Sequence, residues 1–489
     1  MNFDARKLIR EKYITPFKKK DTGYVGVELE FPLINLKKES VSVALLSSSS
    51  ADSLMNRLIS SPFDFKIADT GHDGLIAGVE NSYGDLISFD NSFNNIEFSM
   101  GKALSVKEIS ARFYKYIQII QDFLKENDHI ITGMGTNPYK DFISDSPVNY
   151  DIYNCNRSFL NHIHTKMSTI KTTVPAANTA ISSPSTSGLK RYHGYIFFPA
   201  YISSVQTHID ATMDTFLEKF NLHASLDFAR AALFSNSLPF SSEHKAFPDC
   251  ICFRDYLWES GGFSYNPLNA GKNNRDFSSV DDFIESYMTR SIHMNMRNGK
   301  YNHFMPVPLK DYFSGSHNNS EDITNSRPED IDCGRPEDID CFYSFRTVEA
   351  TFRGTIEIRS DCAQPIREAF APSAFNFGIS ASYTEAKNLF KSFIEEQNLS
   401  NYTNGELRDF IIYNNCLPGS SNKSLSAFLL KLIQLSDSGL NKISPQDIPF
   451  LEPLYERALK LKCPAKEMKT LLSKGMSYEK MIRIYAASL

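Results

Sequence analysis

Four short stretches of this chain alternate polar side chains with residues that favour strands. The stretches are residues 26–30, the pair Asp90 and Glu97, residues 206–210 and residues 353–359. Successive side chains of a strand point to opposite faces, so the polar residues of each stretch share one face. The residues between them are Val, Leu, Thr and Ile, which pack well in sheets. The pattern therefore predicts a sheet with acids, amides and an arginine on one face, a surface suited to divalent cations and phosphates.

A single alternating acid pair has a plainer explanation. It can be the solvated face of an antiparallel sheet. Against this, Glu28 and Glu30 lead directly into the apolar run 31–34, which is not typical of a solvent-exposed edge strand. The agreement of four stretches favours a shared site over four separate solvated faces.

The same stretches, in the same order, resemble the glutamate–cysteine ligases of the plant and bacterial group, which includes the ligase of ergothioneine pathways. The matching residues of the first half are Gly26, Glu28, Glu30, Asp90, Glu97, Phe98, Ser99, Ser204, Val205, Gln206 and Asp210. Those of the second half are residues 232–240, Arg254, Trp258, Arg353, Gly354, Glu357, Arg359, Ala363, Gln364 and Pro365. The resemblance covers roughly residues 20–480.

Three positions depart from the family pattern. His208 stands where the family has Asn, and Leu238 is inserted before Pro239. Cys362 stands where the family has Asp, and an Asp is found one residue earlier, at position 361. On a strand, a shift by one residue moves the carboxylate to the opposite face. All three departures bear on which substrates are recognised.

The resemblance implies an α+β fold like that of glutamine synthetase. In that fold a curved, mostly antiparallel β-sheet forms a half-open funnel, with flanking helices outside and the site on the concave polar face. Residues 1–425 would form the catalytic glutamate–amine ligase domain. Residues 426–489 would form a C-terminal helical segment packed on it.

The resemblance also implies the reaction. ATP, with Mg²⁺, would phosphorylate the γ-carboxylate of L-glutamate, and the amine of L-cysteine would displace phosphate to give γ-glutamylcysteine and ADP. Moving a phosphoryl group between anions needs positive charge at the transfer point. The implied metal ligands are Glu28, Glu30, Asp90, Glu97 and Glu357. The implied catalytic residues are Glu357, Arg359 and Gln206, and the implied substrate-binding residues are Arg254, Arg353, Arg359 and His208.

His208 has two interpretations that the sequence leaves open. A neutral histidine beside a metal cluster can bind metal or orient the incoming amine. Alternatively, it is a hydrogen-bonded structural residue in a slot that the family fills with Asn. Cys362 is expected to be a small buried residue rather than a nucleophile, because no base lies near it in sequence.

Two other functions remain as alternatives. One is the same ligation with another amino acid or amine in a peptide or natural-product pathway. The other is an inactive homologue that serves as a binding or regulatory subunit. Retention of all five acids argues against the inactive homologue, because a silent copy would be free to lose them.

Composition narrows the class of protein. The chain has 489 residues and a formal net charge of −5 without a long basic block, which argues against a nucleic-acid partner. It has no run of eighteen apolar residues and no apolar signal core at its N-terminus. Its eight cysteines are not at zinc-binding spacing, so free thiols are expected. We therefore expect a cytoplasmic protein whose partners are small-molecule substrates.

Several local elements can also be predicted. Residues 105–125 predict a helix with a capping box at Ser105 and one apolar stripe. The Ser-rich segments 47–50 and 182–188 predict loops, and the second is a candidate lid. Residues 327–341 hold a seven-residue duplication that predicts an expanded surface loop, with a Cys333–Cys341 redox pair as an alternative. The segment from Ser444 to the C-terminus predicts helices.

Overall fold

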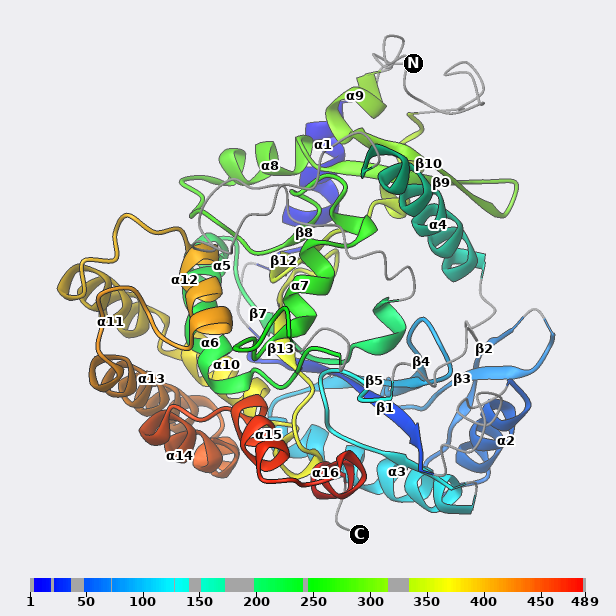
Figure 1. Cartoon of the computed structure of the whole chain (residues 1–489). Coiled ribbons are helices and arrows are strands. Elements are labelled where there is room, and N and C mark those ends of the chain that lie inside the picture. Colours follow the sequence, from blue (N-terminus) through cyan, green and yellow to red (C-terminus); the bar gives the residue numbers. More distant parts are fainter. Residues whose placement is uncertain are drawn as a thin grey trace.

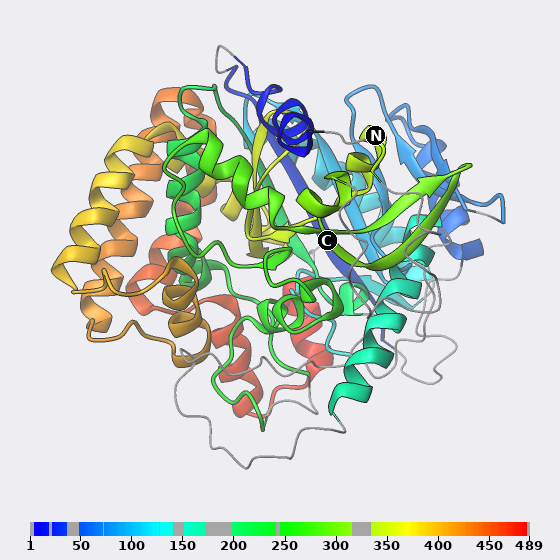
Figure 2. The ribbon, with the colours of Figure 1, turned by 90° about the horizontal axis from the view of Figure 1, so that it is seen from above.

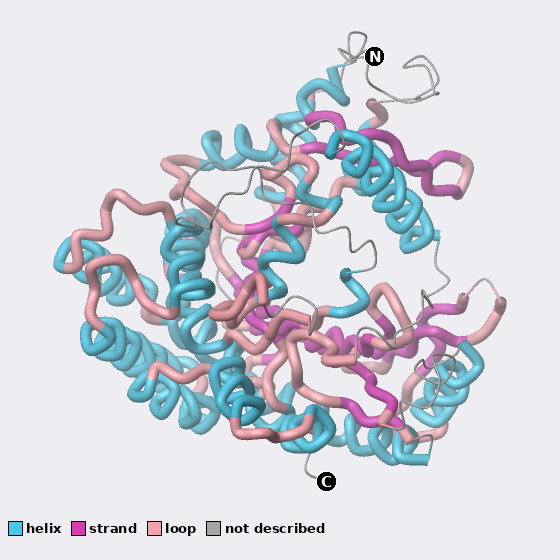
Figure 3. Tube along the Cα trace, in the orientation of Figure 1, coloured by secondary structure: helices cyan, strands magenta, loops and turns pink. Residues whose placement is uncertain are grey.

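One large antiparallel sheet organises the chain (Figures 1 and 3). The computed structural model describes residues 4–18, 22–36, 48–71, 73–126, 128–139, 151–171, 198–240, 245–314 and 334–486. Within these residues, nine strands form the sheet. In sheet order they are β12 (Val348–Ala350), β13 (Thr355–Cys362), β7 (Ser204–Asp210), β1 (Val25–Asn35), β5 (Asn95–Ala103), β4 (Leu86–Phe89), β3 (Ile76–Glu80) and β2 (Lys66–Thr70), and β6 (His129–Ile131) pairs with the end of β1.

Four helices cover the apolar face of the sheet. They are α2 (Ser48–Ile59), α3 (Val106–Glu126), α6 (Asp227–Phe234) and α10 (Ala371–Ala381). The rings of Phe31, Phe98 and Phe113 meet where β1 and β5 pack on α3, with centroids 4.9–6.2 Å apart. Because Phe31 and Leu29 alternate with Glu30 and Glu28 along β1, the acids point to the other face of the sheet.

Smaller elements lie over the polar face. They are α7 (Phe253–Glu259), α8 (Val280–Met288), the antiparallel pair β9 (Ser291–Arg297) and β10 (Lys300–Pro308), and the short parallel pair β8 (Ala270–Gly271) and β11 (Phe345–Arg346). In Figure 1 these elements lie on the opposite side of the sheet from α3 and α10. These elements surround the polar face, which is therefore a recess and not an open surface.

The remaining helices fill the ends and sides of the molecule. They are α1 (Ala5–Ile9), α4 (Asp151–Lys171), α5 (Phe216–Ser225), α9 (Leu309–Ser314), α11 (Tyr383–Glu396), α12 (Asn404–Asp409), α13 (Asn422–Ile443), α14 (Glu452–Lys460), α15 (Pro464–Ser473) and α16 (Tyr478–Tyr485). Figure 2 shows the helices from α11 to α14 gathered at one end and strands β2–β5 at the other. Helices together with a large antiparallel sheet confirm the α+β class.

The C-terminal helices pack tightly on the sheet layer. Helix α13 crosses α10 so closely that a Cβ at Gly378 would lie 2.3 Å from the Ser436 carbonyl oxygen, and one at Gly439 would lie 2.0 Å from the Gly378 carbonyl oxygen. Only glycine allows this approach. The domain boundary expected after residue 425 falls inside α13. Among the described residues, no helix has the length and apolar character that crossing a bilayer requires.

The local predictions had mixed outcomes. The helix expected over 105–125 is confirmed as α3, and the Ser105 hydroxyl accepts the Glu108 backbone N–H at 3.1 Å. The C-terminal helices are also confirmed. The loop expected over 47–50 is wrong from Ser48 onward, where α2 begins, because its buried stripe packs on β3 and outweighs the serine run. The segment 182–188 lies outside the described residues.

The second copy of the duplication is not a surface loop. Pro336–Cys341 forms a 3₁₀ helix in which Asp338 and Cys341 are buried. Asp338 accepts hydrogen bonds from Arg297 and from the Tyr312 hydroxyl, so the acidic repeat serves as an internal anchor. The first copy, with Cys333, lies outside the described residues.

Candidate functional site

The register of the central strands brings predicted residues of all four stretches onto one face. Glu28 of β1 is paired with Gln206 of β7, and Glu30 of β1 is paired with Glu97 of β5. On the other side of β7, His208 is paired with Glu357 of β13. Directly paired residues of neighbouring strands share a face, so these side chains point into the same recess.

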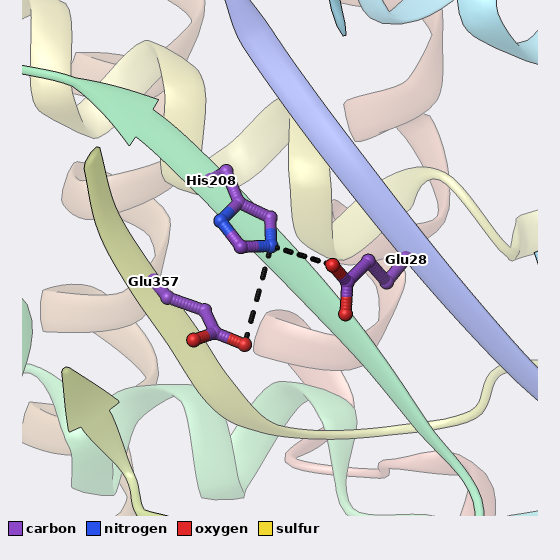
Figure 4. Close-up of side chains that lie close together, drawn as sticks. All are labelled: Glu28, His208 and Glu357. Carbon is purple, nitrogen blue, oxygen red and sulfur yellow. Dashed lines mark hydrogen bonds and ion pairs between the residues drawn. The ribbon is translucent and has the colours of Figure 1, made fainter. Parts of the chain in front are cut away.

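Glu28, His208 and Glu357 form the centre of this face (Figure 4). His208 Nε2 lies 3.1 Å from Glu28 Oε1 and 4.0 Å from Glu357 Oε1. Its other ring nitrogen, Nδ1, lies 3.3 Å from the Thr355 hydroxyl. One ligand atom from each of the three residues lies within 4.8 Å of the others, which is the size of a cation site.

A second group of acids lies beside this centre. Glu30 accepts hydrogen bonds from the Ser204 backbone N–H at 2.9 Å and from Gln206 Nε2 at 2.8 Å. Glu97 accepts one from the Ser99 hydroxyl at 2.7 Å. Asp90 follows β4 and accepts one from the Asn91 amide at 2.6 Å. These partners fix the carboxylates in place.

The pKa values differ between the two groups of acids on this face. Burial, together with repulsion from the neighbouring acids, raises the pKa of Asp90 to about 8 and that of Glu97 well above its usual value. Burial also raises the pKa of Glu30. At Glu28, His208 and nearby arginines outweigh the effect of burial and lower the pKa to about 2. Crowded carboxylates of this kind become fully ionised when cations bind between them.

The donor set fits Mg²⁺. Hard divalent cations take carboxylate and amide oxygens, and imidazole is an accepted nitrogen ligand for related metals. Gln206 Oε1 is buried and has no hydrogen-bond partner among the described residues. This oxygen is therefore free to bind a cation. The acids, this amide oxygen and His208 together would hold the metal.

The three arginines predicted to bind substrates occupy different places. Arg359 is half-buried, with 23% of its side chain exposed; it pairs with Glu357 and faces the same recess. Arg353 lies at the turn between β12 and β13, is 64% exposed and reaches Glu28 at 3.9 Å. Arg254 of α7 is buried over the sheet, and its Nε has no partner among the described residues. Together they supply positive charge on two sides of the acids.

Two hollows flank the central cluster and share Glu28, His208 and Arg353. One, of about 410 Å³, also reaches Lys18 and Lys102. The other, of about 350 Å³, is lined by aromatic residues. The aromatic residues are Tyr13, Tyr287, Phe342, Tyr343 and Phe352. Hollows of this size suit small-molecule ligands that meet at the cluster.

The sequence did not identify Glu349 as part of this face. Glu349 of β12 is paired with Glu357, is buried, and accepts hydrogen bonds from Arg290 at 2.9 Å and from the Tyr287 hydroxyl at 2.9 Å. The only sequence signal is a single acid between Val348 and Ala350. A stretch of three residues is too short to show an alternating pattern.

The departures at Asp361 and Cys362 directly follow a bulge in β13, where the register shifts between Ile358 and Asp361. Asp361 points to the helix layer, where it accepts a hydrogen bond from Asn376 of α10 at 2.9 Å, so the predicted change of face is confirmed. Cys362 is buried with its thiol 3.6 Å from that of Cys252, whose hydrogen bond lowers the pKa of Cys362 to about 7. The inserted Leu238 is buried.

Comparisons with known proteins found likeness in structure but not in sequence. No family model and no curated protein sequence matches the chain. One similar structure is a glutamate–cysteine ligase from Francisella tularensis in complex with AMP; the match is 12% identical, covers 96% of this chain and 88% of that chain, and has a TM-score of 0.47. Another is a bifunctional glutathione synthetase from Pasteurella multocida, with 12% identity, 98% of this chain covered and a TM-score of 0.45. This chain covers 52% of that synthetase.

Proposed function

We propose that this chain is an ATP- and Mg²⁺-dependent carboxylate–amine ligase of the glutamate–cysteine ligase type. It joins the γ-carboxylate of L-glutamate to the amine of L-cysteine and releases ADP and phosphate. The observation that carries the proposal is the gathering of five carboxylates on one face of an antiparallel sheet, with Arg359 beside them and Arg254 in the neighbouring hollow. Among the described residues, the amide oxygen of Gln206 on this face has no hydrogen-bond partner. The proposal includes the plant and bacterial subfamily, the glutamine synthetase-like funnel and the cytoplasmic location expected from the sequence.

In the proposed reaction, a γ-carboxylate oxygen of glutamate attacks the terminal phosphorus of ATP. The bond from that phosphorus to the bridging oxygen breaks, and ADP leaves. The amine then attacks the acyl carbon, loses a proton, and phosphate leaves. Mg²⁺, when bound, neutralises the phosphate charges.

The residues of the chain bind and orient the reactants. Glu28, Glu30, Asp90, Glu97 and Glu357 would hold the metal, with Gln206 and His208 completing the donor set. Arg359 lines the aromatic hollow and pairs with Glu357. It would hold the phosphoryl group during transfer, because guanidinium binds such groups through two parallel hydrogen bonds. Arg254 would bind the α-carboxylate of glutamate, and Arg353 would close over the phosphates from the exposed turn.

Trapping with hydroxylamine tests the reaction. We expect glutamate, ATP and hydroxylamine to give γ-glutamyl hydroxamate with ADP and phosphate in equal amounts, because an acyl phosphate on glutamate is open to any strong nucleophile. Chromatography of the nucleotide product is the deciding measurement. AMP with pyrophosphate would place the chain in a different mechanistic class, and no glutamate-dependent turnover with any amine would favour the inactive homologue.

The accepting amine is tested with a panel of amino acids in the same assay. The described structure contains one specific reason to include amines other than cysteine. Three positions that depart from the family pattern, His208, Leu238 and Cys362, are all buried, and His208 lines both hollows beside the central cluster. A higher kcat/KM for another amine than for cysteine would establish the alternative ligation.

The role of His208 is tested by His208→Asn. If His208 binds metal, we expect the Mg²⁺ concentration for half-maximal activity to rise by about tenfold or more, because a ligand is weakened while both carboxylates remain. The ratios of rates among amines should stay as in the wild-type chain. Altered ratios with an unchanged metal requirement would instead establish the substrate-binding role, and no change in either would make His208 structural.

A further inference from the structure

A third hollow lies between helix α7 and strand β13, and the buried Arg254 and the half-buried Arg359 both line it. Arg254 and Trp258 of α7 form one wall, and Arg359 and Ser360 of β13 form another. The distance between the two guanidinium groups therefore depends on how α7 sits over β13. Neither element fixes this by itself, since α7 is a seven-residue helix and β13 is irregular at this point.

A buried guanidinium outside the hollow bridges the neighbours of both arginines. Arg408 of α12 is 1% exposed and donates from Nε to Asp255 Oδ2 at 2.6 Å and from Nη2 to the Ser360 carbonyl oxygen at 3.1 Å. Asp255 follows Arg254 in sequence, and Ser360 follows Arg359. One side chain thus ties the backbone beside one arginine to the helix that carries the other.

Two hydrogen bonds to Asp227 fix the end of this bridge that lies on strand β13. Ser360 lies in the bulge of β13, where the register shifts between Ile358 and Asp361. The Ser360 hydroxyl donates to Asp227 Oδ1 at 2.6 Å, and Arg408 Nη1 donates to the same oxygen at 3.1 Å. A bulge re-aims the side chains next to it, so fixing Ser360 fixes the direction of Arg359.

Helix α7 is also held at its C-terminal end, by ion pairs through Lys272. Lys272 Nζ lies 2.5 Å from Asp409 Oδ1 and 2.6 Å from Glu259 Oε1, and Glu259 is the last residue of α7. Consecutive residues of α12, Arg408 and Asp409, therefore hold both ends of α7. These ion pairs are buried, so losing one partner is costly and their geometry is well defined.

We propose that α12, through Arg408 and Asp409, sets the spacing between Arg254 and Arg359 and so determines the affinity for the amino-acid substrate. Arg408 is a positioning residue: it touches no substrate and acts through the two arginines. The inference rests on the proposed function, because it takes Arg254 to bind the α-carboxylate of glutamate at a fixed distance from the phosphoryl group held by Arg359.

Arg408→Lys tests the proposal. Lysine keeps the charge but bonds from one point, so it cannot bridge Asp255 and Ser360 together. We expect KM for glutamate to rise by about tenfold while kcat changes by less than about threefold, since the transfer chemistry keeps its groups. Trp258 is the single tryptophan of the chain, lies on α7 and stacks on Phe345 at 4.7 Å. Its emission and its quenching by acrylamide should change in the variant without any ligand.

Arg457→Lys is the matched control. Arg457 is also a buried arginine that bridges separate elements, donating to the Leu233 carbonyl oxygen at 2.9 Å and to Gln364 at 2.7 Å, but none of these residues lines the hollow. It should leave KM and the Trp258 signal as in the wild-type chain. Equal effects of the two variants would overturn the proposal, as would a folded Arg408→Lys chain with wild-type KM and fluorescence.

A second variant covers failure of Arg408→Lys to fold. Asp409→Asn weakens the ion pair with Lys272 and leaves Arg408 in place, so we expect a smaller change in the same direction in both KM and Trp258 emission. No change in either would contradict the proposal. Failure of the wild-type chain to bind glutamate in calorimetry with ATP analogue and Mg²⁺ would overturn the proposed function instead, and the ligand-free Trp258 signal would still decide whether α12 positions α7.

Discussion

Glu97→Gln is expected to lower turnover by on the order of 10² or more at saturating ATP, glutamate and Mg²⁺. The amide keeps the shape of the side chain and can still accept the hydrogen bond that the Ser99 hydroxyl gives to Glu97. The change therefore removes the charge and little else. Steady-state rates at several Mg²⁺ concentrations measure the effect, and near-normal activity at saturating Mg²⁺ would exclude Glu97 as a metal ligand.

The same variant should not lose stability. Glu97 is half-buried beside Glu28, Asp90 and Glu30, and desolvation together with repulsion from these acids raises its pKa. Without metal, neutralising Glu97 relieves that repulsion, so the melting temperature of the metal-free chain should be equal or higher than that of wild type. An active-site residue typically shows this opposition between activity and stability.

Asp447→Asn is the control, and it is expected to lower stability without changing activity. Asp447 is a buried carboxylate that also has a raised pKa, but it accepts the backbone N–H groups of Val106 and Lys107 at 2.8 Å each, at the start of α3. An amide offers one acceptor oxygen in place of two. We expect a lower melting temperature and an unchanged kcat, because this site lies on the helix layer.

Much of the polar face could be predicted because the strand period is two. Alternation alone placed Glu28 and Glu30 together, and likewise Gln206 and His208, whatever the partner strands were. The pairing of Glu28 with Gln206 and of His208 with Glu357 could not be predicted, because register is set by contacts between strands far apart in sequence. The resemblance to a family supplied the order of the stretches but not their geometry.

The misses have identifiable causes. Glu349 lies on a strand of three residues, too short for periodicity to show. Ser48 begins a helix because tertiary packing outweighs the loop preference of serine. Asp338 of the second duplicated segment is buried because Arg297 and Tyr312, remote in sequence, donate hydrogen bonds to it. The ties from Arg408 are also invisible in the sequence, because they connect residues about fifty to one hundred and eighty positions apart.

Arg359→Lys is expected to lower kcat by on the order of 10² to 10³. Arg359 is only 23% exposed, pairs with Glu357, and lines both the hollow below α7 and the aromatic hollow. Lysine retains the charge but not the planar fork that meets a phosphoryl group with two parallel hydrogen bonds. The loss should appear in kcat with little change in KM for glutamate, because the interaction is strongest during phosphoryl transfer.

Arg353→Lys gives the comparison that assigns the roles. Arg353 is the same residue type on the neighbouring turn, but it is 64% exposed and 3.9 Å from Glu28, so solvent screens its charge. Its replacement should cost less than about tenfold, and mainly in KM for ATP. A larger kcat loss for Arg353→Lys than for Arg359→Lys would transfer the phosphoryl-binding role to the exposed turn. A rise in KM for glutamate with unchanged kcat in Arg359→Lys would instead assign Arg359 to the α-carboxylate, beside Arg254.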